Sequence, residues 1–134
     1  MIREILFRGK AKKNGEWVYG DLCYSRSGKP FIRYWHGAPG KEVYRAEGVE
    51  RNSVGQFSGM VDKNERKIYE GDIVLKRTYN GKKEFPVTFS GGMFHCGFGG
   101  GSSTPTHRYT LEDKQIEVVG NIFDNPELLE VTNG

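Results

Sequence analysis

The side chains that could ligate a soft metal ion or take part in nucleophilic catalysis are three histidines and two cysteines: His36, His95, His107, Cys23 and Cys96. His95 and Cys96 are adjacent, so on a strand they would face opposite sides and could not share one ion. Neither a Cys-x-x-Cys nor a His-x-x-x-His spacing occurs, although zinc sites favour such spacings. No Gly-x-Ser-x-Gly elbow is present either. The sequence therefore predicts no metal, no cofactor and no catalytic residue, and we expect a protein that is not an enzyme.

A glycine-rich segment over residues 97–104 could wrap an anionic ligand with its backbone N–H groups. It lacks the Gly-Lys-Ser/Thr of a phosphate-binding P-loop. A flexible loop between strands is the simpler interpretation. A small-molecule-binding protein that uses this loop stays open as an alternative function.

Two turns rich in lysine and arginine could bind an anionic polymer. Their cations are Arg8, Lys10, Lys12, Lys13, Lys76, Arg77, Lys82 and Lys83. If both turns lay on one face, these cations would converge near exposed aromatic rings such as Tyr79, a combination suited to single-stranded nucleic acid. Lys and Arg also keep hairpin tips soluble, which is the alternative explanation for these residues. The sequence leaves open whether the two turns lie on one face.

The charges of the chain are unevenly distributed. The formal net charge is only +3, but residues 1–50 carry ten Lys and Arg against six Asp and Glu, and residues 112–134 carry one Lys against six acids. Such polarity could steer a nucleic acid or an acidic partner to one end of the protein. It is equally suited to head-to-tail self-association.

The composition favours short strands. A chain of 134 residues is long enough for one domain over 1–134 with a core that needs no disulfide or metal. Its 19 glycines and five prolines suit tight turns and argue against long helices. Asn14-Gly15 and Asn80-Gly81 are strong hairpin signals. We expect an all-β, mainly antiparallel fold, with short strands and hairpins in a coiled, barrel-like arrangement.

Large aromatic side chains should build the core of this fold. The candidates are Trp17, Phe31, Trp35, Phe57, Tyr69 and Phe123. After the last strand, Asp124-Asn125-Pro126 predicts a short C-terminal helix, because Asn caps free N–H groups and Pro suits the first helical position.

The central stretch 53–74, SVGQFSGMVDKNERKIYEGDIV, alternates with period two, turns at Asp62–Glu65 and returns as a second strand. Together with REILFRGK and GEWVYGDL near the N-terminus and VGNIFDNPELL near the C-terminus, it resembles the YopX-type family, small proteins carried by phages and prophages of Gram-positive bacteria. The resemblance implies a mostly β domain and no established activity, so it supplies no catalytic residues.

Charged residues interrupt the first apolar run, and no segment is long enough to span a bilayer. We therefore expect the protein in the cytoplasm of the bacterial host, with reduced thiols. The expected function is a non-enzymatic binding or adaptor module, with nucleic acid or a host or phage protein as partner. The main alternative is a self-assembling homo-oligomer without a nucleic-acid role, since unpaired strand edges invite pairing.

Overall fold

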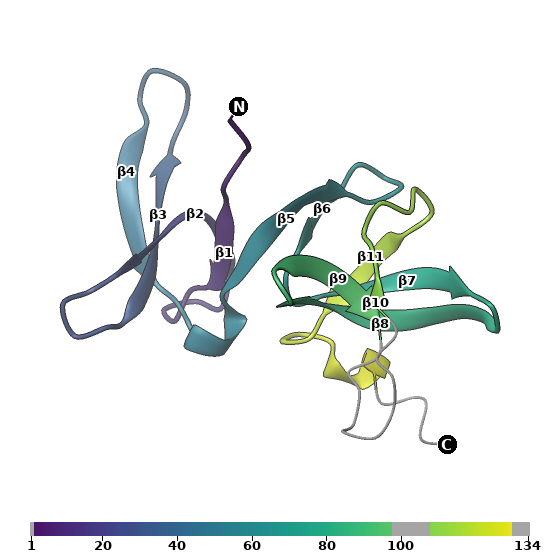
Figure 1. Ribbon diagram of the computed structural model, residues 1–134. Coiled ribbons are helices and arrows are strands. Elements are labelled where there is room, and N and C mark those ends of the chain that lie inside the picture. Colours follow the sequence, from purple (N-terminus) through teal and green to yellow (C-terminus); the bar gives the residue numbers. More distant parts are fainter. Residues whose placement is uncertain (1, 98–107, 130–134) are drawn as a thin grey trace. The chain divides into compact units, whose positions relative to one another are not determined.

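The computed structural model describes residues 2–97 and 108–129, and in these ranges the chain is built from antiparallel β-strands and two 3-10 turns (Figure 1). Its internal contacts group into two compact units, Met1–Phe57 and Ser58–Gly134. That the chain forms one domain stays a prediction. Within the described ranges, no helix is long and apolar enough to cross a lipid bilayer.

The first unit contains strands β1 to β4, one 3-10 turn and the beginning of β5. Their bounds are β1 Phe7–Lys10, β2 Trp17–Tyr24, β3 Pro30–His36, β4 Val43–Gly48, η1 Arg51–Ser53 and β5 Gly55–Val61. The strands of this unit follow the order β4-β3-β2-β1-β5. The β1–β2 turn is the predicted Asn-Gly hairpin, closed by a hydrogen bond from the Gly15 N–H to the carbonyl of Ala11.

Strand β2 changes its partner half-way along its length. Its first half pairs with β1 as far as Gly20, and its second half pairs with β3 from Asp21 onward. A Cβ atom at Gly20 would lie 2.1 Å from the carbonyl oxygen of Arg33. Glycine is therefore required at this position, because it lets the backbone of β3 approach β2 where the two ladders meet.

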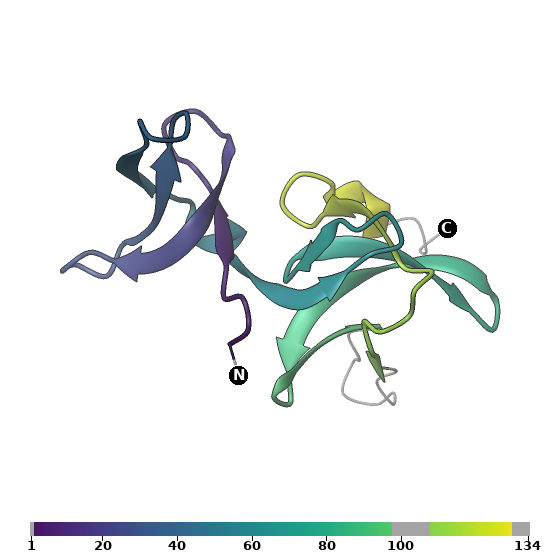
Figure 2. The ribbon, with the colours of Figure 1, turned by 90° about the horizontal axis from the view of Figure 1, so that it is seen from above.

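The second unit contains the end of β5, six further strands and a second 3-10 turn. Their bounds are β6 Lys67–Tyr69, β7 Asp72–Thr78, β8 Gly81–Ser90, β9 Met93–Gly97, β10 Arg108–Tyr109, β11 Glu117–Asn121 and η2 Pro126–Leu129. β6 is the neighbour of β5, and the other strands form a sheet with the order β10-β9-β8-β7-β11. Figures 1 and 2 show β7 and β8 side by side as a long two-stranded ribbon, which is the predicted hairpin around Asn80-Gly81.

Pro86 lies where β8, like β2, changes its partner. Residues 81–86 of β8 pair with β7, and residues 87–90 pair with β9. Proline has no N–H for a ladder and is normally found at an edge. It is accommodated in this inner strand because one ladder ends at Pro86 and the next begins at Val87.

Aliphatic side chains dominate the core of each unit. In the first unit, Ala11, Ile32 and Val49 are almost completely buried. In the second unit, one cluster holds the buried residues Ile68, Val74, Phe85, Val87, Cys96, Leu111, Ile116 and Val118. Burial raises the pKa of the Cys96 thiol to about 11, so this free cysteine stays protonated and packs as an apolar group.

The predicted aromatic core is correct in part. Phe57 and Tyr69 are buried, as predicted, and Trp17 and Phe31 are half-buried. Trp35 and Phe123 are 66% and 37% exposed, so their assignment to the core was wrong. The two residues have large apolar side chains, but Trp35 lies on β3 and Phe123 in the turn after β11, and neither side chain is buried.

The all-β, antiparallel fold is confirmed, but the barrel-like closure is wrong. The described strands form two sheets that are not closed into a barrel, and the five-stranded sheet ends at β10 on one side and β11 on the other. At the end of the first unit's sheet, β4 is exposed except for Glu47. Period-two alternation predicts which face of a strand is buried, but it carries no information on which strands pair at the edges.

The predicted short C-terminal helix is also wrong, because Pro126–Leu129 forms a single 3-10 turn. The Asn125 side chain accepts a hydrogen bond from the backbone N–H of Asn121 at 3.2 Å, which ties it back to β11. Leu128 packs over Gly120: a Cβ atom added at Gly120 would lie 3.0 Å from the Cδ1 atom of Leu128. The glycine-rich segment 97–104 falls outside the described residues after Gly97.

Candidate nucleic-acid interface

The eight predicted cations belong to different units. Arg8, Lys10, Lys12 and Lys13 lie on β1 and the following turn in the first unit, and Lys76, Arg77, Lys82 and Lys83 lie on the β7–β8 hairpin in the second. Each set is therefore considered in the environment of its own unit.

In the first set, Arg8 and Lys10 pack against an aromatic ring. The guanidinium carbon of Arg8, a residue only 6% exposed, lies 4.7 Å from the centre of the Trp17 ring, and the Lys10 Nζ lies 5.8 Å from it. Lys13 donates a hydrogen bond to Glu47 at 2.8 Å. This bond holds the pKa of Glu47 below its usual value, so the pair stays ionised. Two of the four cations thus pack on Trp17 and a third is paired with a carboxylate.

In the second set, cations face each other across the hairpin. Lys76 is opposite Lys83, and Arg77 is opposite Lys82. Lys76 is neutralised by Asp113, whose Oδ2 lies 2.9 Å from its Nζ, and this bond lowers the pKa of Asp113.

The exposed pair, Arg77 and Lys82, has carboxylates close by. Glu84 and Glu117 both lie opposite Leu75, on the neighbouring strands and on the same face as Arg77. The positive charge at this hairpin is therefore partly compensated within the second unit.

The two units differ in net charge. Residues 1–57 contain eleven Lys and Arg against six Asp and Glu, and residues 58–134 contain nine against eleven. The first unit is therefore positive by five charges and the second negative by two. An anionic polymer would be attracted to the first unit.

The first unit also carries a cluster that the sequence analysis missed, which we call the aromatic platform: Arg33, Trp35 and Tyr44. Trp35 on β3 is directly opposite Tyr44 on β4, and their ring centres are 4.7 Å apart. The guanidinium carbon of Arg33 lies 4.5 Å from the Tyr44 ring centre. Trp35 is 66% and Tyr44 40% exposed, so both rings are in contact with solvent.

The platform is held in place by local contacts. The Tyr44 hydroxyl donates a hydrogen bond of 3.4 Å to Asp21, which is opposite Arg33 on β2. Aromatic pairs and cation–π contacts add roughly 0.5–1.5 kcal/mol each. The rings are thus positioned before any ligand arrives.

The sequence contained a signal for this cluster. Phe31, Arg33 and Trp35 share one face of their strand because side chains alternate. An arginine between two aromatic residues on the same face indicates a solvent-facing surface. The size of the Trp35 side chain predicts burial, and that criterion misses the pattern.

Another candidate for chemistry is a serine–histidine pair on the β8–β9 hairpin. The Ser90 Oγ lies 2.6 Å from the His95 Nε2, and burial lowers the pKa of His95, which keeps the ring neutral. Within the described residues, however, the buried Nδ1 atom of His95 has no hydrogen-bond partner. A Ser–His nucleophile needs a third group that orients the base at that atom.

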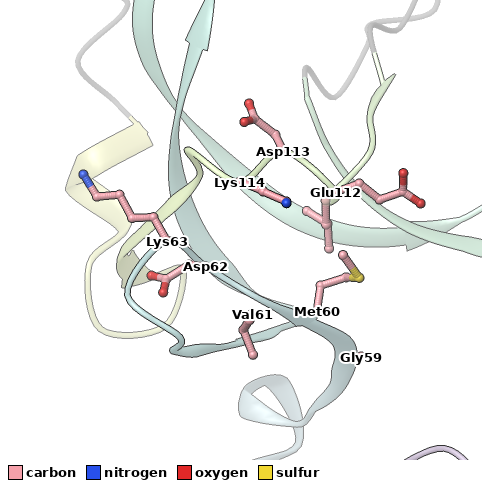
Figure 3. Close-up of a pocket in the computed structure, with 9 residues that line it drawn as sticks. Gly59, Met60, Val61, Asp62, Lys63, Glu112, Asp113 and Lys114 are labelled. Carbon is pink, nitrogen blue, oxygen red and sulfur yellow. The ribbon is translucent and has the colours of Figure 1, made fainter.

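A groove of about 450 Å³ lies in the second unit between the β5–β6 turn and the segment 111–114 (Figure 3). In the described part of the chain, no group of three or more His, Cys, Asp and Glu residues is placed to hold a metal ion.

Comparison with known proteins identifies a family and a fold. The family model described as YopX protein matches residues 6–130. A crystal structure of protein EF1440 from Enterococcus faecalis is similar over 96% of this chain and 99% of that chain, with 22% sequence identity and a TM-score of 0.58. That likeness supports the fold alone. The comparison with curated proteins gave no match.

Proposed function

The chain belongs to the YopX family, and from this premise we propose that it is a non-enzymatic module that binds single-stranded nucleic acid through the aromatic platform of its first unit. The observation that carries the proposal is the exposed pair of Trp35 and Tyr44 beside Arg33. We further propose that it is encoded by a phage or prophage and acts in the cytoplasm of the bacterial host.

Stacking supplies the affinity in this proposal. A base that stacks on an exposed aromatic side chain contributes about 1–3 kcal/mol, and every base has a π-face, so such binding tolerates different sequences. Two tilted rings suit the splayed bases of a single strand better than a stacked duplex.

Charge supplies the attraction. The excess of five positive charges in the first unit would raise the local concentration of a phosphate backbone. If about three phosphates are neutralised, a plot of the logarithm of the affinity against the logarithm of the salt concentration should have a slope of about −2. The paired cations Lys13 and Lys76 contribute little, because carboxylates already neutralise them.

Fluorescence anisotropy with a labelled oligothymidylate tests the proposal. Trp35→Ala should weaken binding by about 5- to 100-fold, which corresponds to the loss of one stacked base. Tyr24→Ala is the matched control, because Tyr24 is a 59% exposed aromatic residue of the same unit outside the platform. If wild type shows no salt-dependent binding, or if both variants lose affinity equally, the proposal is wrong.

Self-assembly through β4 is the second candidate. In the described structure β4 is the end strand of the first unit's sheet, and Val43 and Tyr44 on it are exposed. A free strand edge can pair with a second copy through backbone hydrogen bonds. Light scattering behind size exclusion would distinguish the candidates, since an oligomer joined by a strand edge should persist at high salt, without nucleic acid.

A further inference from the structure

We infer that the groove of the second unit, between the β5–β6 turn and the segment 111–114, is a binding site for a small amphiphilic carboxylate, an apolar chain that ends in one anionic group. The site is separate from the aromatic platform and does not depend on the proposed nucleic-acid binding. Its volume of about 450 Å³ is within the range of small-molecule pockets, which are mostly apolar with few polar groups.

The floor of the groove is apolar and continuous with the core. Leu111 is a buried member of the core cluster, and Met60 packs against that cluster. Val61 lines the groove and is 46% exposed. A ligand chain placed here would cover apolar surface that is now open to water, and each buried CH₂ group favours binding.

Most charges around the groove are already used. The Asp62 carboxylate accepts hydrogen bonds from three backbone N–H groups. The Asp113 carboxylate forms an ion pair with Lys76, and the Lys63 Nζ lies 3.3 Å from the Oε1 atom of Glu117. These groups keep the walls in place and have little capacity left for a ligand.

Lys114 is the cation left for the ligand. It is exposed and, within the described residues, makes no hydrogen bond or ion pair with its side chain. Lys114 lines the groove, and in Figure 3 its ammonium group lies between the segment 112–114 and Met60, whereas the carboxylates of Glu112 and Asp113 and the ammonium of Lys63 are directed outward. An apolar floor with one cation above it complements an apolar chain with one anion.

The two walls are tied to one residue, Ile116, which directly precedes β11, so the groove exists before the ligand binds. The Lys63 N–H donates to the carbonyl of Ile116 at 2.9 Å, and the Ile116 N–H donates to the carbonyl of Asp113 at 3.2 Å. Ile116 thus joins the turn on one side to the segment 111–114 on the other. Such preorganisation reduces the entropy lost on binding.

Nuclear magnetic resonance titration of the ¹⁵N-labelled chain tests the inference, with sodium octanoate as the probe below its micelle concentration. Shifts should concentrate on residues 59–63 and 111–114. In the series from butyrate to octanoate, affinity should rise by up to about fourfold for each CH₂ group. Shifts spread over the surface, or an affinity that is indifferent to chain length, would overturn the inference.

A charge reversal tests the role of the lysine. Lys114→Glu should weaken octanoate about tenfold and should strengthen binding of octyltrimethylammonium, the cation of equal chain length. Lys41→Glu is the control, since it makes the same change at an exposed lysine of the first unit and should alter neither affinity. If Lys114→Glu binds octanoate as wild type does, the anionic group does not pair with Lys114 and the assignment fails.

Discussion

Replacement of Asp62 by alanine should destabilise the protein by about 3 kcal/mol. The buried Asp62 carboxylate accepts three backbone hydrogen bonds, from Asn64 and Arg66 in its own turn and from Val118 on β11, at 2.8, 2.9 and 2.9 Å. The Val118 N–H is buried, so leaving it without an acceptor costs about 1–3 kcal/mol. The other two N–H groups belong to exposed residues that water can reach, and each contributes about 0.5–1.5 kcal/mol.

Urea unfolding followed by far-ultraviolet circular dichroism measures this loss. With a slope of about 1–3 kcal/mol per molar urea for a small protein, the midpoint should fall by about 1–3 M. Glu112→Ala is the control, because Glu112 is an exposed carboxylate in the same unit and should change stability by less than about 0.5 kcal/mol. A loss below about 1 kcal/mol for Asp62→Ala would refute the argument that this carboxylate joins the turn to β11.

The same carboxylate predicts a pH dependence. Burial would raise the pKa of Asp62, but hydrogen bonds from three backbone N–H groups outweigh it, and the pKa in the folded protein is below its ordinary value. A lowered pKa means that the stabilisation is complete above the pKa of the unfolded chain and is lost as pH falls through the pKa of the folded protein. Stability should therefore fall less steeply from about pH 5 to pH 3 in Asp62→Ala than in wild type. Parallel curves for the two proteins would contradict this assignment.

Three further predictions follow from other contacts. Gly20→Ala should cost more than about 3 kcal/mol in urea unfolding, because its Cβ would lie 2.1 Å from the carbonyl oxygen of Arg33; a stability near wild type would show that β3 can move away freely. Iodoacetamide at pH 8 should alkylate the half-buried Cys23 well before Cys96, whose pKa is raised to about 11 by burial. Mass spectrometry of timed samples measures the order of alkylation, and modification of Cys96 before Cys23 would contradict this prediction. Trp35→Phe should shift the tryptophan emission to shorter wavelength, because it removes an indole that is 66% exposed; an unchanged spectrum would mean that the ring is covered in solution.

Much of the fold was predictable because it depends on local patterns. Asn-Gly pairs at 14–15 and 80–81 predicted two hairpins, since glycine accepts positive φ, and Gly15 and Gly81 adopt it. Period-two alternation predicted strands over most of the described chain. The stretches that resemble the YopX family predicted the family, which the match over residues 6–130 confirms.

The candidate site was predictable only in part. The basic residues could be counted, and Arg8 and Lys10 do lie beside an aromatic ring, although it is Trp17 and not Tyr79. Sequence reasoning could not tell that Lys13 and Lys76 would be neutralised, because their partners Glu47 and Asp113 are 34 and 37 residues away in the chain.

The sequence by itself determined the class of the fold, the hairpins, the family and the basic character of the first unit. These properties follow from the composition and from interactions between residues close together in the chain. The tertiary structure alone decided that the sheets stay open, that Trp35 and Tyr44 meet on an exposed face, and that Lys114 lines an apolar groove. The physical reason is that alternation assigns a side chain to one of two faces of a strand, while burial, pairing and charge compensation depend on which distant segments pack against that face.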